Sequence, residues 1–325
     1  MTTTRHLGVL DGWRGISILC VLAAHMLPLG PHGELNVAAG VLGMVIFFVL
    51  SGFLITSMLL TGIPVSDFVA RRFFRVVPLA WLYLAVAMLV ADPAPASWWS
   101  HFLFYANLPP QDLVPVTGHL WSLCMEVQFY VFIALWYALT GPRGLIVLPV
   151  LAVAFTGVRA WYDIYEVSIT YYRIDEILAG CVLALAWHGH LGSRTLAFIK
   201  AGPPLVLIAL LLVSCLNFGG VYILRPYLAA MLVGTTLANN GTRLAGWLNT
   251  RALAFLASIS YALYVIHPML MHSWLGSGGL VEKYAKRPLL FVVLFALAYA
   301  STHLFERRWI AIAKRMTRGV RLTAR

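Results

Sequence analysis

Two residues with chemical potential, Arg14 and His25, lie 11 positions apart in the first apolar run of the chain, LDGWRGISILCVLAAH. On an α-helix this spacing places both side chains on one face, about 16 Å apart along the axis. If the run crosses a membrane, each titratable group needs a partner or a function, because burying a charge in lipid is costly. Asp11 could pair with Arg14 at the helix start. A snorkelling arginine and a hydrogen-bonded core histidine fit the same pattern.

A carboxylate lies at a matching predicted depth. Glu126, in GHLWSLCMEVQFY, is about five residues, or ~8 Å, below the outer end of its expected helix, and His25 lies similarly in the first helix. A glutamate that accepts a hydrogen bond from one ring nitrogen fixes the tautomer and makes the other nitrogen more basic, as a general base requires. A structural hydrogen bond between two buried polar groups would satisfy the same depths.

A basic cluster, RRFFRVVP, precedes the third apolar run, and its Arg72 and Arg75 are three positions apart. On a short helix entering that run they would share one face. Arginine binds phosphate through two parallel hydrogen bonds, so the pair suits a phosphorylated ligand. A topology anchor or a contact with lipid headgroups is the alternative.

Two further segments carry polar groups in the outer half of the expected bundle, RIDEILAG and SISYALYVIHP. Asp175, Glu176, Tyr261 and His267 could line an outward-facing cavity that suits a hydroxylated acceptor. Alternatively, Arg173 forms a structural ion pair with Asp175, and the tyrosines belong to the aromatic belt of the membrane interface.

The composition requires a membrane to hold these elements. The 325 residues are 61% hydrophobic and 11% charged, with a mean hydropathy of +0.84, which excludes a soluble globular protein. Apolar runs can cross a hydrocarbon core where they reach about 20 residues. We expect an all-α bundle of about ten transmembrane helices in one domain, 1–325, with a basic cytoplasmic tail at 306–325. The expected spans are residues 13–30, 37–58, 77–92, 121–140, 144–158, 174–188, 203–217, 221–238, 253–272 and 288–305.

The net charge of +11 serves as a topology signal and not as a nucleic-acid surface, because the basic residues fall at the ends of apolar runs. With both termini cytoplasmic, roughly three quarters of the 23 Lys and Arg residues lie on the inner side. The outer side receives Arg159, Arg173, Arg225, Lys283, Lys286 and Arg287.

The four cysteines and the scattered histidines form no disulfide framework and no metal-binding pattern.

Taken in order, the segments resemble the acyltransferase-3 family of integral membrane acyltransferases. The resemblance implies ten spans and transfer of an acyl group from cytoplasmic acyl-CoA to an acceptor hydroxyl on a surface saccharide, a lipid-linked intermediate or a small metabolite. The segments that carry it are LDGWRG with His25, VIFFVLSGFLIT (45–56), RRFFRVVPLAWLYL (71–84), LWSLCMEVQFY (120–130), RIDEILAG (173–180), ISYALYVIHP (259–268) and FERRW (305–309).

By this resemblance, the family's arginine-x10-histidine motif corresponds to Arg14 and His25, and its RxxR motif to Arg72 and Arg75. His25 would be the general base or a transient acyl carrier, oriented by Glu126, and the three arginines would bind the phosphates of CoA. Relatives often have two adjacent acids in the WSLxxExQFY segment. This chain has methionine at position 125, so Glu126 is the one candidate there.

The resulting expectation is an O-acyltransferase of the stand-alone type in the bacterial inner membrane. It would use acyl-CoA, most simply acetyl-CoA, as donor substrate with no bound cofactor, and would contact membrane lipids and a surface polysaccharide or lipid-linked saccharide. Acylation of a small metabolite such as a macrolide is an alternative. So are a flippase-like carrier, in which His25 and Glu126 relay protons, and a structural subunit of an envelope-polysaccharide machine.

Overall fold

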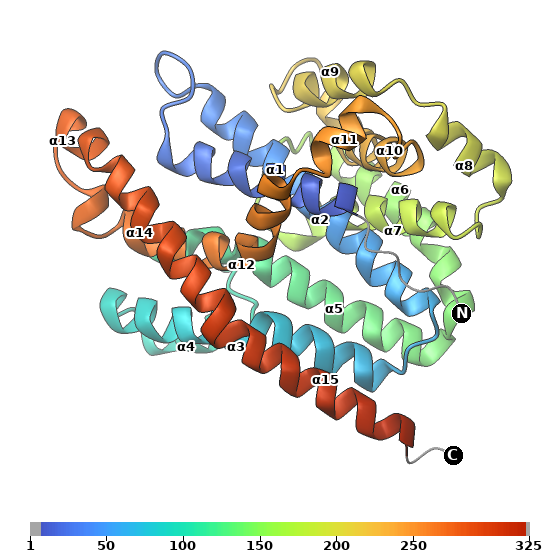
Figure 1. Ribbon diagram of the computed structural model, residues 1–325, viewed down its shortest axis with the longest axis horizontal. Coiled ribbons are helices and arrows are strands. Elements are labelled where there is room, and N and C mark those ends of the chain that lie inside the picture. The colour runs from blue at the N-terminus through green and yellow to red at the C-terminus, as the bar shows by residue number, and fades with distance from the viewer. Residues whose placement is uncertain (1–7, 323–325) are drawn as a thin grey trace. The chain divides into compact units, whose positions relative to one another are not determined.

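The computed structural model describes residues 8–322, which form helices, short 3₁₀ turns and loops and contain no strand (Figure 1). The all-α prediction is therefore confirmed. A helix overlaps each of the ten expected ranges, and α5 (Trp121–Thr140) has the predicted bounds. The uncertain boundary near residue 217 is a real break, because α9 (Pro204–Ser214) ends before α10 (Arg225–Ala238) begins.

Eight helices in the described part of the chain are long and apolar enough to cross a membrane. A ninth crossing is possible if α8 (Ser193–Lys200) and α9, bent by 85°, form one broken span. The remaining expected span, α7 (Asp175–Trp187), has 13 residues and extends about 20 Å, short of the ~30 Å hydrocarbon core. Its burial among protein side chains explains how so short a helix is accommodated.

Two helices begin before the predicted position. Helix α1 (Gly8–Met26) begins five residues early, and it also ends early because Pro28 and Gly30 follow it and disfavour helix. Helix α3 (Val65–Ala91) includes the RRFFR cluster, which the sequence placed on a short helix before the span, and continues through an internal proline. The basic tail is helical as well, as α15 (Arg307–Leu322).

The chain divides into two compact units. Unit 1 consists of Leu145–Val167, Tyr171–Ser260 and the described part of Met1–Ser57. Its core joins α1, α2 (Leu35–Leu60), α7 and α10. Two glycines bring α2 and α7 together: a Cβ on Gly52 would lie 1.9 Å from the Ile177 carbonyl oxygen, and one on Gly180 would lie 2.0 Å from the Val49 oxygen. Helix α6 (Leu148–Trp161) also packs against α7.

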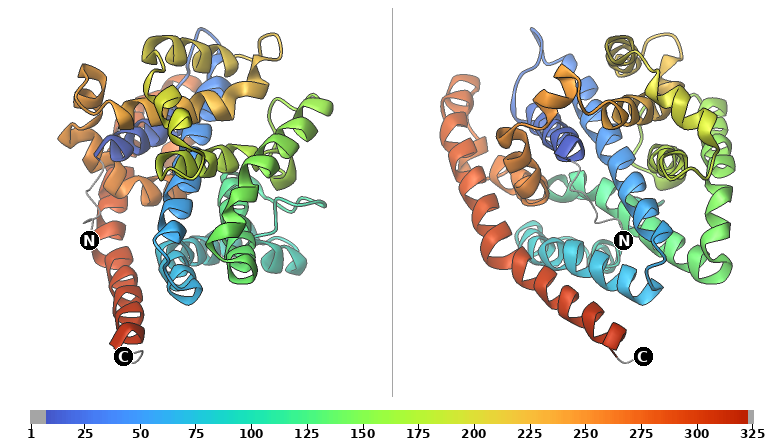
Figure 2. Two further views of the ribbon diagram at one scale, coloured as in Figure 1. Left: turned by 90° about the vertical axis from the view of Figure 1, so that its right-hand side faces the viewer. Right: turned by 45° about the vertical axis from the view of Figure 1, so that its right-hand side comes forward.

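Unit 2 consists of Met58–Gly144, Ser168–Thr170 and the described part of Tyr261–Arg325. It contains α3, α5, and the C-terminal half of α12 (Arg251–Met271). Its last element is one long helix made of α14 (Arg287–Ala300), a π-helical turn (Ser301–Glu306) and α15. Helix α15 runs beside α3 (Figures 1 and 2).

Candidate functional site

Arg14 and His25 lie on the same helix, α1, as the sequence predicted. The expected pair of Asp11 and Arg14 is present, with 3.6 Å between Oδ1 and Nη1 and about a quarter of each side chain exposed. Because α1 ends at Met26, His25 lies in the last helical turn, and the predicted depth below the helix end is wrong.

The His25 side chain is exposed, as a group that must meet a substrate has to be. Its Nδ1 lies 3.0 Å from the Val21 carbonyl oxygen. In the neutral ring Nδ1 therefore carries the proton and Nε2 the basic lone pair. In the same unit, Glu166 is close enough for its charge to act on the imidazole. The expected partner, Glu126, belongs to unit 2, so the pairing of His25 with Glu126 stays a prediction.

In unit 2, Glu126 and Arg72 are linked through one tyrosine. Glu126 is 6% exposed, and its Oε1 accepts a hydrogen bond of 2.6 Å from the Tyr130 hydroxyl. The Arg72 guanidinium lies over the Tyr130 ring, 5.7 Å from its centroid. A cation over an aromatic face is attracted by the ring quadrupole. Tyr130 thus contacts both the predicted phosphate-binding arginine, Arg72, and the predicted catalytic carboxylate, Glu126.

Arg72 also borders a groove of about 100 Å³ between α3 and α5. The rest of the lining is apolar or aromatic, and the Arg72 Nε is buried without a hydrogen-bond partner. The lining residues are Phe68, Val69, Arg72, Phe73, Val76, Val77, Val127, Tyr130 and Val131.

Arg75 lies on α3 three positions after Arg72, as the sequence predicted. Its charge acts on Tyr261 from α12 and on Glu306 from the C-terminal helix. The charge of Glu126 also acts on Tyr261. The Tyr261 hydroxyl donates a hydrogen bond of 2.5 Å to the carbonyl oxygen of Val76. Tyr261 therefore links the surroundings of Arg75 to those of Arg72 within unit 2.

His267, predicted at the acceptor side, is 1% exposed and lies beside a second imidazole, His119. Their ring centroids are 5.3 Å apart. His267 Nδ1 lies 2.7 Å from the Tyr264 carbonyl oxygen, and His119 Nε2 lies 3.3 Å from that of Val265. The Tyr264 hydroxyl bonds to the His119 carbonyl oxygen and to Ser122 Oγ. The GHLWSL and SYALYVIHP segments thus form one polar cluster.

The glutamine of the WSLxxExQFY segment has a structural role. Gln128 donates to the Phe104 carbonyl oxygen at 2.8 Å and to Asn107 Oδ1 at 2.9 Å, and it accepts from Thr170 at 2.6 Å. These bonds attach the 92–118 segment to residues 168–170. In that segment α4 (Pro95–Phe102) is followed by a 3₁₀ turn (Pro115–Leu120), and burial lowers the pKa of its His101.

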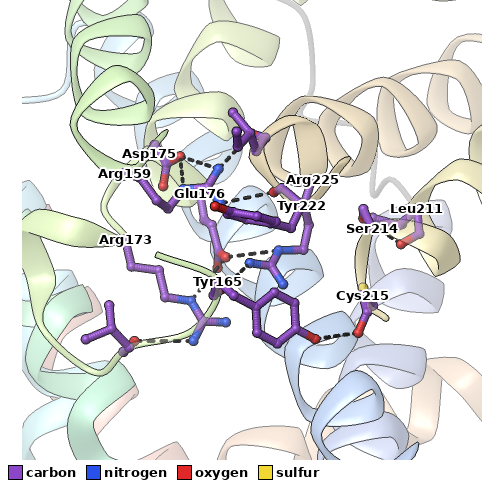
Figure 3. Close-up of polar contacts among 12 residues, drawn as sticks. Arg159, Tyr165, Arg173, Asp175, Glu176, Leu211, Ser214, Cys215, Tyr222 and Arg225 are labelled. Carbon is purple, nitrogen blue, oxygen red and sulfur yellow. Dashed lines mark hydrogen bonds and ion pairs between the residues drawn. The ribbon is translucent and has the colours of Figure 1, made fainter. Parts of the chain in front are cut away.

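Asp175 and Glu176, predicted to bind substrate, are held in a buried ion network in unit 1 (Figure 3). Asp175 pairs with Arg159, 2.8 Å away, and Glu176 pairs with Arg173, 3.1 Å away. The proposed pair of Arg173 with Asp175 is therefore wrong. Arg225 lies 3.8 Å from Glu176, so three guanidiniums face two carboxylates.

Backbone carbonyls complete this network. Arg159 donates to the carbonyl oxygens of Tyr222 (3.0 Å) and Ile223 (2.7 Å), and Arg225 donates to that of Tyr165 (2.6 Å). One oxygen of each carboxylate, Asp175 Oδ1 and Glu176 Oε2, is buried without a hydrogen-bond partner, so substrate contact would require the surrounding side chains to open. The network thus joins α6, α7 and the start of α10, and an acceptor role for Asp175 and Glu176 stays a prediction.

Sequence reasoning missed Glu306, His119 and Glu166 as neighbours of the predicted site. Glu306 had a signal, since it belongs to the FERRW segment and follows an apolar run. His119 belongs to the GHLWSL segment, and Glu166 lies in an irregular loop with no pattern. Among the residues that the structure describes, no group of three or more His, Cys, Asp or Glu side chains could hold a metal ion.

Comparison with known proteins gives a consistent result. A model of the acyltransferase domain family Acyl_transf_3 matches residues 7–307. The chain is 27% identical to YrhL of Bacillus subtilis (strain 168) over 81% of its own length and 48% of that protein. It is 28% identical to the peptidoglycan O-acetyltransferase OatA of Listeria monocytogenes, over 55% of this chain and 33% of that one.

A third relative is the O-acetyltransferase OatA of Staphylococcus aureus (strain NCTC 8325 / PS 47), 25% identical over 82% of this chain and 51% of that protein. The chain thus spans about half the length, or less, of the curated relatives it matches. No solved structure matches it.

Proposed function

The chain belongs to the acyltransferase family whose domain matches residues 7–307, and we propose that it is a membrane O-acetyltransferase that modifies a cell-wall saccharide. The observation that carries the proposal is the family match over nearly the whole chain, together with relatives named as peptidoglycan O-acetyltransferases. The multi-pass helical architecture agrees with an acceptor that is reached at the membrane.

The proposed donor is acetyl-CoA, bound from the cytoplasmic side of the bacterial inner membrane. Arg14, Arg72 and Arg75 would bind its phosphates through charge-assisted hydrogen bonds. Support comes from the Arg72 guanidinium, whose Nε has no acceptor and which borders a groove. The distance of about 16 Å along α1 from Arg14 to His25 suits an extended pantetheine arm.

His25 would carry the chemistry in one of two ways. As general base, Nε2 takes the proton of the acceptor hydroxyl while the oxygen attacks the thioester carbonyl; the C–S bond then breaks, and the CoA thiolate leaves and takes up a proton. As transient carrier, Nε2 itself attacks the thioester carbonyl, and the C–S bond breaks to release the CoA thiolate. The acceptor oxygen then attacks the carbonyl of the acyl-imidazole and loses its proton, and the C–N bond breaks to return the imidazole. Glu126 would orient the ring in either case.

The acceptor side is proposed to include Tyr261 and His267. Asp175 and Glu176 would join it only if the buried arginine pairs open. Peptidoglycan or another envelope saccharide is the proposed acceptor class, because relatives are named as peptidoglycan O-acetyltransferases. A small hydroxylated metabolite, a flippase-like carrier and a structural subunit are the alternatives that the experiment must separate.

The test is release of free CoA thiol by the detergent-purified chain from acetyl-CoA, with and without cell-envelope glycans. His25→Ala and Arg75→Ala should lose thiol release. Their matched controls are His32→Ala and Arg143→Ala, which change exposed residues of the same types. Proton-coupled solute movement without any thiol release would favour the carrier, and turnover by the purified chain alone would exclude the subunit role.

A further inference from the structure

One buried carboxylate of unit 2, Glu306, has no place in the proposed reaction. It is 4% exposed, and its Oε1 accepts a hydrogen bond of 2.9 Å from Thr302. It ends the π-helical turn Ser301–Glu306, and such turns are frequent at functional sites. It also continues the buried row of the C-terminal helix, which consists of Leu290, Leu294, Ala298 and Thr302. Glu306 is therefore a carboxylic acid in a row whose preceding members are apolar, apart from the hydroxyl of Thr302.

The contacts between α15 and α3 show what this acid faces. Phe74 stacks on Trp309 with ring centroids 5.8 Å apart, and Arg71 Nη2 lies 3.4 Å from Thr317 Oγ1. The two helices therefore run antiparallel, side by side (Figure 2). One turn before Trp309 is Glu306, which meets α3 just beyond Phe74. This is where Arg75 lies, and the charge of Arg75 acts on Glu306.

Tyr261 completes the arrangement. Its hydroxyl donates to the Val76 carbonyl oxygen at 2.5 Å, and the charges of Glu306, Glu126 and Arg75 all act on its phenol. Arg75 thus has a tyrosine and a buried glutamate as neighbours, just as Arg72 has Tyr130 and Glu126.

We propose that Glu306 is the positioning residue for Arg75, the counter-charge that keeps its guanidinium inside the bundle, where the donor phosphates are bound. A long arginine side chain near a helix end otherwise turns toward the membrane interface. Ionisable groups inside a bundle are retained when they pair with one another. The inference rests on the proposed function, because the role of Arg75 in binding the donor does.

The test measures thiol release against acetyl-CoA concentration in Glu306→Gln and Glu306→Asp. Glu306→Gln should raise the KM for acetyl-CoA about tenfold, the effect of losing one charge-assisted interaction, with kcat within about twofold of wild type. Glu306→Asp keeps the charge and should recover most of the affinity. The matched control, Thr317→Val, removes a contact from the same helix face to Arg71 and should leave KM unchanged. An unchanged or lower KM in Glu306→Gln overturns the proposal.

A double-mutant cycle separates positioning from general packing. If Glu306 acts through Arg75, Glu306→Gln adds nothing to the dissociation constant for acetyl-CoA in an Arg75→Gln background; binding is measured because Arg75 variants are expected to lose thiol release. Melting temperatures of the same four proteins provide a reading that needs no turnover: coupled losses support the pair, and additive losses refute it. If the wild-type protein releases no thiol and the losses in melting temperature are still coupled, the proposed function is refuted, while the pairing of Glu306 with Arg75 is supported.

Discussion

Replacing Arg159 by methionine should cost about 3–5 kcal/mol of stability, the usual loss when one partner of a buried ion pair is removed. Arg159 and Asp175 are each 1% exposed. The substitution leaves the Asp175 carboxylate with its hydrogen bond from Thr156, at 3.0 Å, and deprives the Tyr222 and Ile223 carbonyl oxygens of their arginine donor. Methionine fills much of the volume, so the loss comes from the orphaned charge and carbonyls and not from a cavity.

The chain contains its own reporters for this measurement. Cys181 and Cys215 in unit 1 are 0% and 2% exposed, and both are free thiols. A dye that fluoresces on reacting with thiols therefore reports unfolding of the detergent-purified protein during heating. Arg159→Met should lower the melting temperature clearly. Arg159→Lys should lower it less, because lysine keeps the charge but lacks the planar fork that reaches the carboxylate and both carbonyls.

The double variant Arg159→Met/Asp175→Leu is the decisive control. It removes both charges, and buried pairs replaced by apolar residues are often as stable as the original. Its melting temperature should lie above that of Arg159→Met. A double variant less stable than the single, or a single variant equal to wild type, would refute the ion-pair reasoning. If Asp175 binds the acceptor, Asp175→Asn should raise the acceptor KM beyond any loss of folded protein.

Three further outcomes are expected. His25→Ala should reduce CoA thiol release at least a hundredfold, as loss of a general base or nucleophile does, with an unchanged melting temperature because the side chain is exposed. Tyr130→Phe should mainly raise the KM for acetyl-CoA, by a small factor, because Tyr130 lies against Arg72. Glu126→Gln should mainly lower kcat, by a larger factor, because Glu126 is proposed to orient His25. Equal effects of the two variants on the same constant would contradict these separate roles. Gly52→Val should prevent normal folding or lower the melting temperature strongly, because its Cβ would lie 1.9 Å from the Ile177 oxygen, and size-exclusion profiles measure this.

The helical architecture could be predicted because it follows from local composition. Apolar runs separated by charge, proline and glycine define helices without reference to the rest of the fold. Boundaries were predicted less well where tertiary packing decides them. Helix α7 is shorter than a span and is still helical, because protein surrounds it. The RRFFR cluster, predicted on a short helix before the third span, is continuous with that span in α3, and α15 packs against α3.

The site could be predicted in part. Spacing along one helix was sufficient for Asp11 with Arg14, which the structure confirms. It was insufficient for the partners of Asp175 and Glu176, because adjacent residues on a helix point in different directions and meet different neighbours. Asp175 reaches back to α6, whereas Glu176 meets Arg173 and Arg225. Such pairings depend on which helices are adjacent, and no periodicity in one chain specifies that.

The same network changes the charge count behind the predicted topology. Arg159, Arg173 and Arg225 were expected among the outer loop charges, yet each is at most 2% exposed and is bound to carboxylates or backbone carbonyls within unit 1. The positive-inside rule concerns charges in loops near the ends of spans, so these three carry no information on orientation. Arg72 and Arg75, expected on the inner side, likewise lie within a helix, α3. The count therefore falls on both sides, and the cytoplasmic location of both termini stays a prediction.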